Sequence, residues 1–452
     1  MDNSLKLEGY IAELTAATRR LSELYPTASA HGAPLYEVSA EAWNLQRRAS
    51  ASLTKIQRLL AGPDDLLQTL TIQTQLLACL QWLGEFQVLA CIPLNDSVSV
   101  QEVADLAGVP EPELMRVVRM TAISGFLEEP QPGWVRHTVL SALFVTKPGY
   151  LDAAMFLAGT VMPAALKMPT ATYRFEDMQM PHQAAYNLAC NSLSSFASDC
   201  DRLPKLQRQW AAYVQYGTGD MLDTATDMLT CLEPLAHSTA KVVETVARST
   251  KRAAILASQY PSLRFIVQMS RAAFRSGNNR RSLGHCNGNG TGDSGAAAHV
   301  VPTQEREPGT HQPITDAAVY LVHLPTLVPV PVAAAAAASL GTGLIKELRA
   351  HLEVLRADPA ALLVLLPHFV LPDLSGGAEK EDLQEEELQA RVRDLSLLQL
   401  TNEKGMELSE LLKLVASVGD SAGHLVIVGR VRGPLSGALA IEVRYQAYND
   451  RR

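Results

Sequence analysis

KVVETVARSTKRAAILASQYPSLRFIVQM, residues 241–269, is the stretch that decides the fold. It contains an apolar strand, Val242–Val246, a helix rich in alanine, Arg252–Tyr260, and, after a proline, a second strand, Leu263–Val267. A strand, a helix and a strand in this order predict a βαβ unit, whose two strands lie parallel in one sheet. A unit of this kind ordinarily holds a nucleotide on glycines in its first turn. The first turn here contains no glycine, so the sequence predicts the scaffold without that nucleotide site.

Strands and helices continue to alternate over residues 236–452. The expected strands are Val242–Val246, Leu263–Val267, His299–Thr303, Ala317–His323, Ala361–Leu371, His424–Val431 and Gly437–Tyr445. The expected helices are Arg252–Tyr260, Gly343–Arg356, Glu379–Leu400 and Glu407–Val418. This alternation predicts an α/β domain with a mostly parallel, Rossmann-like sheet covered by helices. The last two strands are joined by RGPLSG and are expected to form an antiparallel hairpin.

Composition places the chain among globular proteins. It has 452 residues, 47% of them hydrophobic and 19% charged, which predicts two or three domains with a sizeable core. The net charge of −8 argues against a large sequence-independent DNA-binding surface, because neutralising phosphates requires clustered lysine and arginine. Six scattered cysteines lack metal-ligand spacing, which favours buried thiols in a reducing compartment. They are Cys79, Cys91, Cys190, Cys200, Cys231 and Cys286.

Neither a signal peptide nor a membrane span is expected. The start, MDNSLKLEGYIAEL, contains acidic residues and no long apolar core. The apolar run VPVPVAAAAAASLGTG is interrupted by prolines and is too rich in alanine to span a bilayer. We therefore expect an intracellular, soluble protein without membrane association.

Residues 1–150 divide into two expected regions. Residues 1–64 form a helical region, in which PTASAHGAP separates two helices. Residues 65–150 begin with a helix in which leucine and isoleucine recur at helical spacing over residues 65–88. A helix, a glycine turn, a second helix and a hairpin follow, which is the layout of a winged helix.

A winged helix can recognise DNA or serve as a dimerisation or packing module. In DNA recognition the second helix enters the major groove with its N-terminal residues. That helix here begins with Glu111 and Glu113, and the wing begins with Glu128 and Glu129. Carboxylates at these positions would face phosphates, so the sequence favours packing or dimerisation over DNA recognition.

Two segments beyond the winged helix leave alternatives open. Residues 151–235 are an expected helical connector rich in methionine, which can form an adaptable binding surface but more often fills a core. Residues 379–387 carry six carboxylates, which favours a solvated helix start over an acidic partner-binding face. A third segment, residues 276–299, is rich in Gly, Asn and Ser and is expected to be a disordered loop inside the α/β domain.

The order of winged helix, helical connector and α/β domain resembles the O-methyltransferase family of fungi and plants over nearly the whole chain. The stretches that carry the resemblance are RHTVLSALFV, SQYPSLRFIVQM, TQEREP before AAVYLVHL, and PLSGALAIEVRY. The resemblance implies a seven-stranded methyltransferase-type sheet. Between FLAGTVMPAALKMPTATYRF and CLEPLAHS the chain is more narrowly similar to fungal methyltransferase-like transcriptional co-activators of the aflatoxin-pathway regulator type.

The resemblance also implies where an S-adenosylmethionine site would lie. The glycine-rich turn of the family falls on Val246, Ala247 and Thr250, each of which adds a side chain. The acid that binds the ribose hydroxyls falls on Met269, which accepts no strong hydrogen bond. Glu244 stands where the family carries an acid in the first strand, but one carboxylate is a weak remnant. We therefore expect no bound cofactor.

The catalytic positions implied by the resemblance depart in the same way. The histidine base of the family falls on Leu327, and the glutamate that supports it falls on Gly405. His323 lies four residues before the base position, inside a strand, where a satisfied structural histidine is the expected role. A general base needs hydrogen-bond reach to its proton, and neither member of the pair is present. The chain also has no Walker loop, GxSxG elbow or HExxH motif, and no metal site is expected.

Three functions follow as hypotheses. The leading one is a catalytically inactive O-methyltransferase homologue that serves as co-activator of a fungal polyketide-type gene cluster. The resemblance implies a pathway-specific zinc-cluster transcription factor as its partner, a homodimer, and a place in the nucleus and cytoplasm. The alternatives are an active S-adenosylmethionine-dependent O-methyltransferase and a direct DNA binder.

Overall fold

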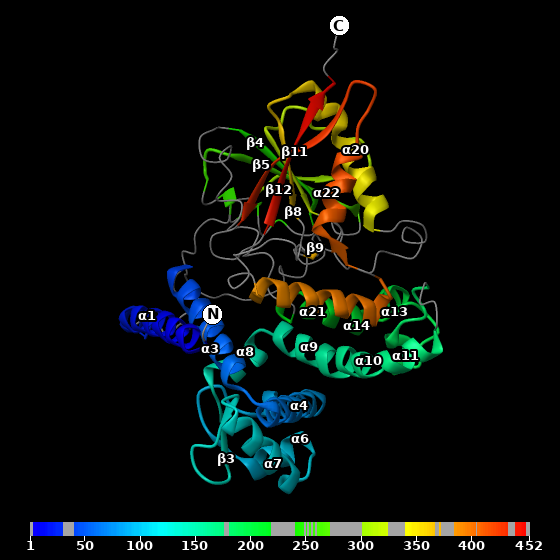
Figure 1. The fold of residues 1–452 in the computed structure, drawn as a ribbon. Helices are drawn as coiled ribbons and strands as arrows, with labels where there is room; N and C mark the ends of the chain where they lie inside the picture. The colour runs from blue at the N-terminus through cyan, green and yellow to red at the C-terminus, as the bar shows by residue number, and fades with distance from the viewer. Residues whose placement is uncertain are drawn as a thin grey trace, which may run out of the picture. The chain divides into compact units, whose positions relative to one another are not determined.

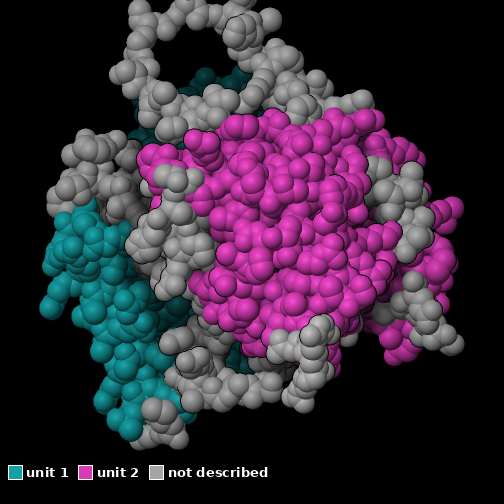
Figure 2. Space-filling view, turned by 90° about the horizontal axis from the view of Figure 1, so that it is seen from above, with its two compact units in different colours: residues 1–162, 208–217 teal, residues 163–207, 218–452 magenta. Residues whose placement is uncertain are grey.

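The computed structural model divides the chain into two compact units (Figure 2). Unit 1 comprises Met1–Met162 with Arg208–Gly217, and unit 2 comprises Pro163–Gln207 with Thr218–Arg452. The residues described are 3–29, 40–175, 180–217, 240–247, 250, 253–254, 256–257, 260–271, 301–323, 340–366, 370–371, 384–403, 405–432 and 439–448. The expected loop 276–299 lies outside them. The four regions expected from the sequence are a finer division and stay a prediction.

Unit 1 begins with two long helices, α1 (Asn3–Ser29) and α3 (Ala40–Leu60), which pack chiefly against each other (Figure 1). α4 (Pro63–Glu85) and α5 (Val88–Cys91) follow. The next elements have the order that the sequence predicts: β1 (Val98–Ser99), α6 (Val100–Ala107), α7 (Glu111–Ile123), β2 (Leu127–Glu128) and β3 (Trp134–His137). The three strands form one antiparallel sheet in the order β1-β3-β2.

Local sequence explains the boundaries of this sheet-and-helix module. The Ser99 side chain caps α6 by accepting from the backbone N–H of Glu102. Gly108 ends α6 in the left-handed region, with φ of 68°, where glycine has no Cβ to clash. Leu114 and Val118 of α7 are fully buried against the other apolar residues of the module. The module therefore has its own hydrophobic core.

Short helices connect the module to the α/β part of the chain. They are α8 (Val139–Thr146), α9 (Gly149–Phe156), the π-helical turn η1 (Leu157–Val161), α10 (Met162–Leu166), α11 (Met168–Arg174), α12 (Ala185–Ala189), α13 (Phe196–Arg202) and α14 (Pro204–Tyr216). The continuous helix Gly149–Leu166 is long and apolar enough to cross a membrane by length and composition alone, and a third of its residues are buried in the protein. Core helices of soluble proteins meet the same criterion.

The sheet of unit 2 has seven strands in the order β11-β12-β8-β7-β4-β5-β6 (Figure 1). The strands are β4 (Lys241–Ala247), β5 (Arg264–Met269), β6 (Thr303–Glu305), β7 (Val319–His323), β8 (Leu362–Leu366), β11 (Gly423–Arg432) and β12 (Leu439–Ala447). β12 pairs antiparallel with both β8 and β11, and the other pairings are parallel. All side chains of β7 and β8 are buried, as expected for central parallel strands covered on both faces.

Helices α20 (Leu340–Ala357) and α22 (Leu408–Ala416) cover one face of this sheet. Leu344, Leu348 and Leu355 recur on α20 at helical spacing and are buried in the core cluster of that face. The opposite face has a second cluster, in which Ala253 and Leu256 from the segment between β4 and β5 are fully buried. The sheet therefore lies between two apolar layers.

Two strand predictions need correction. The expected strand Ala361–Leu371 is interrupted: β8 ends at Leu366, and β9 (Val370–Leu371) pairs parallel with β10 (Met406–Glu407) in a separate two-stranded sheet. The third strand lies at Thr303–Glu305, later than expected, because its pairing with β5 runs from Val267 to Met269. The helix α21 (Gln384–Thr401) agrees with the expected helix Glu379–Leu400 over the described residues, and residues 379–383 lie outside them.

Candidate functional site

The carboxyl ends of β4 and β7 mark the point where the strand order reverses direction along the chain. Open α/β sheets bind ligands outside the carboxyl ends of their strands at such a point. Here Glu244 of β4 and His323, the last residue of β7, are buried and face each other. The His323 Nε2 atom lies 2.7 Å from Glu244 Oε1. His323, expected to be a structural histidine, is thus paired with Glu244, the acid of the first strand. The Glu244 carboxylate therefore has a partner within the protein.

Val246 has a backbone φ of 57°, in the left-handed region that favours glycine. The register between β4 and β5 shifts between Glu244 and Ala247, so the chain bulges at this residue. A β-branched side chain in this region is a genuine outlier and costs about 1–3 kcal/mol. The backbone therefore turns as a glycine would, although the side chain is valine.

Replacing Val246 by glycine is expected to change the free energy of unfolding by less than about 1 kcal/mol, because relief of backbone strain offsets the lost side-chain contacts and the greater freedom of the unfolded chain. Val243 of the same strand is fully buried. Replacing it by glycine is expected to lower the free energy of unfolding by about 3 kcal/mol or more. Urea unfolding of the two variants measures the contrast. Equal losses would contradict strain at Val246.

The other expected cofactor positions lie in or beside the core. Met269 and Ala247 are paired in the parallel register of β5 and β4, and both side chains are buried in the same apolar cluster. The Thr250 carbonyl accepts a hydrogen bond from the Ala254 N–H. The structure therefore brings Val246, Ala247 and Met269 together at neighbouring strand ends, and Met269, which the sequence comparison predicts at the position of the ribose-binding acid, is buried in the core.

Beyond Met269, an arginine binds the carboxylates at the end of β6. Arg271 Nε donates to Glu305 Oε1 at 2.8 Å, and the Arg271 backbone N–H donates to Glu307 Oε1 at 2.9 Å. Both members of the Arg271–Glu305 pair are partly exposed. These acids are therefore directed to arginine, which reduces their availability to the hydroxyls of a nucleoside.

Of the two positions where the resemblance places the catalytic pair, the structure describes only Gly405. Leu327, the position of the family base, lies outside the described residues. The Gly405 backbone N–H donates to Asp394 Oδ1 at 2.8 Å, and a Cβ at Gly405 would lie 2.5 Å from the same oxygen. Any side chain at residue 405, including the glutamate of the family, would displace Asp394. Among the described residues no group of three or more His, Cys, Asp or Glu could hold a metal ion.

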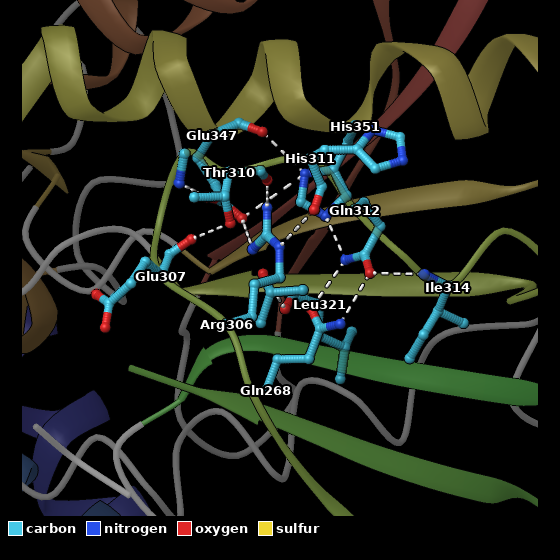
Figure 3. Close-up of polar contacts among 12 residues, drawn as sticks. Gln268, Arg306, Glu307, Thr310, His311, Gln312, Ile314, Leu321, Glu347 and His351 are labelled. Carbon is cyan, nitrogen blue, oxygen red and sulfur yellow. Dashed lines mark hydrogen bonds and ion pairs between the residues drawn. The ribbon is translucent and has the colours of Figure 1, made fainter. Parts of the chain in front are cut away.

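A buried polar network that the sequence did not predict lies between α20 and the loop after β6 (Figure 3). Arg306 Nη1 donates to Glu347 Oε1 at 2.7 Å, and the two side chains are only 3% and 5% exposed. The other Glu347 oxygen accepts from the Gly309 N–H, and Arg306 also donates to the Thr310 carbonyl. This ion pair fastens the loop to the helix.

Two glutamines and a histidine extend the network across the sheet face. Gln268 of β5 and Gln312 exchange amide hydrogen bonds at 2.8 and 2.9 Å, and both are fully buried. The Gln312 amide also lies 3.1 Å from His351 Nε2, while His351 Nδ1 lies 2.8 Å from the Glu347 carbonyl oxygen. These partners assign the neutral tautomer, in which Nδ1–H donates and Nε2 accepts. The sequence clue was polar Glu347 and His351, four residues apart on the apolar face of α20.

Burial lowers the pKa of His351 below its ordinary value of 6.5, and the neighbouring Glu347 only partly opposes this. The folded state therefore binds fewer protons than the unfolded state below pH 6.5, so stability is present above that pH and is lost as the pH falls. Between pH 7.5 and 5.5 the wild type is expected to lose up to about 1.4 kcal/mol more than His351→Leu. Urea unfolding at the two pH values tests this, and parallel losses would contradict it.

The acids of the β2–β3 hairpin are paired with arginine. Arg136 donates to both carboxylate oxygens of Glu128, at 2.8 and 2.7 Å. Arg119 of α7 lies 3.6 Å from Glu129. Arg119 and Arg136 are thus both paired with carboxylates of this hairpin.

The strand order, with one antiparallel strand beside the edge, together with the helical N-terminal part, defines a protein of the methyltransferase fold. Solved structures agree. OxaC in complex with SAH and oxaline has a TM-score of 0.60 at 15% identity, over 98% of this chain and 100% of OxaC. The mitomycin 7-O-methyltransferase MmcR has a TM-score of 0.56 at 16% identity, over 89% of this chain and 99% of its own. At such identities the likeness establishes the fold alone.

Curated relatives establish the family. The chain is 43% identical to the monodictyphenone cluster transcriptional coactivator mdpA of Emericella nidulans, over 99% of this chain and 100% of mdpA. It is 44% identical to the agnestins biosynthesis cluster transcriptional coactivator AgnL9 of Paecilomyces divaricatus, over the full length of both. No family model matches the chain. The chain belongs to this family of fungal cluster transcriptional coactivators with a methyltransferase-like fold.

Proposed function

We propose that this protein is a catalytically inactive methyltransferase homologue that acts in the nucleus as transcriptional coactivator of a fungal secondary-metabolite gene cluster of the polyketide type. Its partner is a pathway-specific zinc-cluster transcription factor, which makes the DNA contact. The observation that carries the proposal is the state of the carboxyl ends of β4 and β5, called here the cofactor edge, in a chain of the coactivator family. Val246 and Met269 lie there, at the positions where the resemblance to O-methyltransferases places S-adenosylmethionine contacts.

Charge supports an indirect role at DNA. The chain has a net charge of −8. In the sheet-and-helix module of β1 to β3, Arg119 forms an ion pair with Glu129, and Arg136 forms one with Glu128. A protein that neutralised phosphates with this module would have to break those pairs. Binding through a protein partner does not carry that cost.

The proposal includes a homodimer formed through unit 1. Among the residues described, α4 exposes a row of apolar side chains: Leu66 is 58% exposed, Leu67 64% and Leu70 55%. A second copy of the same helix would cover such a surface, as isologous interfaces do. Sedimentation should therefore give a dimer whose dissociation constant rises at least about tenfold in Leu67→Lys, because a buried lysine in an apolar interface costs more than 1.4 kcal/mol. A monomeric wild type at micromolar concentration removes the homodimer from the proposal.

A pulldown and a complementation experiment test the coactivator role. The full-length protein should recover the zinc-cluster factor of its own cluster, and deletion of its gene should lower cluster transcripts. Glu244→Gln is the informative variant, because Gln keeps a hydrogen bond to His323 but removes the remaining acid of the cofactor edge. Restoration of transcripts by this variant supports a non-enzymatic role. Failure of both the pulldown and the deletion phenotype overturns the proposal.

A second candidate is an active O-methyltransferase with an altered site. It is favoured by the fold and by Glu244, which stays at the first strand of the sheet. This candidate predicts that Glu244→Gln fails to restore transcripts and that the wild type binds S-adenosylmethionine.

A further inference from the structure

The pattern Arg-Arg-X-Ser, where X is any residue, occurs twice in the N-terminal helix pair α1 and α3, called here the α1–α3 hairpin. α1 contains Arg19-Arg20-Leu21-Ser22, and α3 contains Arg47-Arg48-Ala49-Ser50. Each pattern places a pair of arginines two and three residues before a serine. Serine kinases whose substrate clefts are lined with carboxylates select this spacing, because guanidinium groups pair with carboxylates in fixed geometry.

Both serines are exposed in the structure. Ser22 donates from Oγ to the Arg19 carbonyl at 2.7 Å, a local bond that an extended substrate can give up. Ser50 is followed two residues later by Ser52, which is buried and donates to Glu13 at 3.0 Å. Only the first serine of that Ser-Ala-Ser sequence is therefore accessible without breaking the contact between the helices.

The hairpin is built so that it can open locally. Its buried residues, among those described, are small: Ala17, Ala42, Ala49 and Ser52. Ion pairs across the helices join partly exposed groups, Arg20 with Glu41 and Arg48 with Glu13. Surface pairs contribute little, and small side chains bury little apolar area. Segments with few buried apolar contacts open at low free energy, which lets a kinase bind the chain in extended form.

We propose that the α1–α3 hairpin is the substrate of an arginine-directed serine kinase, with Ser50 as the main phosphate acceptor and Ser22 as the second. The Ser50 Oγ attacks the γ-phosphorus of ATP, the bond from that phosphorus to the β-phosphate oxygen breaks, ADP leaves, and the hydroxyl proton passes to the aspartate of the kinase. Each phosphate adds close to two negative charges at pH 7. The modification therefore changes the charge of the surface that the hairpin presents to other molecules.

The surroundings of the two sites set their order. Arg20 is held by both Glu23 and Glu41, at 2.8 Å each, so two carboxylates compete with the kinase for it. Glu23 also follows Ser22 directly and repels the incoming phosphate. Arg48 has a longer contact, 3.5 Å, to Glu13, and Ser50 is followed by alanine. Ser50 is therefore phosphorylated first.

The test uses the full-length protein, ATP and the catalytic subunit of a cyclic-AMP-dependent protein kinase as the probe. Mass spectrometry of the proteolysed product should place the first phosphate on Ser50, with Ser22 modified more slowly. The Arg47→Ala/Arg48→Ala double variant should lower the initial rate at Ser50 about tenfold or more, because charge-assisted hydrogen bonds are lost. Ser50→Ala should remove that site, and alanine favours the helix, so the variant folds.

Ser124 provides the matched control, because it is exposed at the end of α7 and has no arginine pair before it. Ser124→Ala should leave the phosphate on Ser50 unchanged. Two results overturn the proposal. One is phosphorylation of a synthetic peptide of residues 41–58 with none of Ser50 in the full-length protein, which means that the hairpin stays closed. The other is an unchanged rate in the double arginine variant.

Discussion

Replacing Glu347 by alanine is expected to lower the free energy of unfolding of the α/β part by about 3–5 kcal/mol, because the variant leaves the charge of Arg306 buried and unpaired. The Arg306 side chain is only 3% exposed, and Glu347 is its carboxylate partner at 2.7 Å. Glu347 also accepts from the Gly309 N–H, so the substitution removes a second, partly buried hydrogen bond. At about 2–4 °C per kcal/mol for a domain of this size, thermal unfolding should begin at least about 6 °C lower.

Glu353→Ala is the matched control on the same helix. Glu353 lies 3.6 Å from His311, and both side chains are more than 60% exposed. An exposed pair of this kind contributes about 0–1 kcal/mol, so the melting curve should stay nearly unchanged. Differential scanning calorimetry of the two variants and the wild type measures the contrast. Equal melting curves for Glu347→Ala and Glu353→Ala would show that the buried pair does not hold the loop to α20.

The fold could be predicted because its signal is repeated in every strand. Val242, Leu321 and Val364 are apolar for the same reason, which is burial of central parallel strands between two layers. The end of β8 was predicted too late, because Val370 and Leu371 are equally apolar but pair with β10. A run of apolar residues does not indicate which sheet its strands belong to.

The buried polar contacts could not be predicted, because they join residues far apart in the sequence. Gln268 and Gln312 belong to different segments, and only the close approach of the loop after β6 to β5 makes them partners. The same holds for Glu244 and His323, whose pairing depends on β4 and β7 being neighbours. A sequence pattern marks such residues as polar in apolar surroundings, and the partner follows only from the strand order.

At Val246 the backbone keeps a conformation that favours glycine, although the residue is valine. The sequence predicted a missing glycine there, and the backbone nevertheless adopts a φ of 57°. The bulge between β4 and β5 fixes this conformation, because the register on both sides of it is set by pairing with β5. The fold therefore imposes the turn even where the residue is unsuited to it, while Met269 adds apolar packing to the neighbouring strand end.

No saturable binding of S-adenosylmethionine is expected in calorimetry at ligand concentrations up to about 1 mM. A dissociation constant of about 1 mM corresponds to a binding free energy of about −4.1 kcal/mol. Met269 is buried among apolar side chains. The resemblance to O-methyltransferases predicts at this position an acid that binds the ribose hydroxyls. Loss of such a charge-assisted bond alone costs about 1.5–3 kcal/mol, or roughly tenfold to over a hundredfold in affinity. Val246 lies at the position where the resemblance predicts a glycine that contacts the cofactor through its backbone, and Glu244 contacts His323.

A structurally related enzyme, such as OxaC, serves as the positive control under the same conditions. Binding by this chain at micromolar concentration would contradict an inactive cofactor site, and Glu244→Gln would then decide where the ligand lies. A loss of affinity in that variant would place S-adenosylmethionine at the β4 edge despite Val246 and Met269, whereas an unchanged affinity would place it elsewhere. Absence of binding in both the wild type and Glu244→Gln agrees with strand ends that serve packing, because Glu244 contacts His323 and Met269 is buried in an apolar cluster.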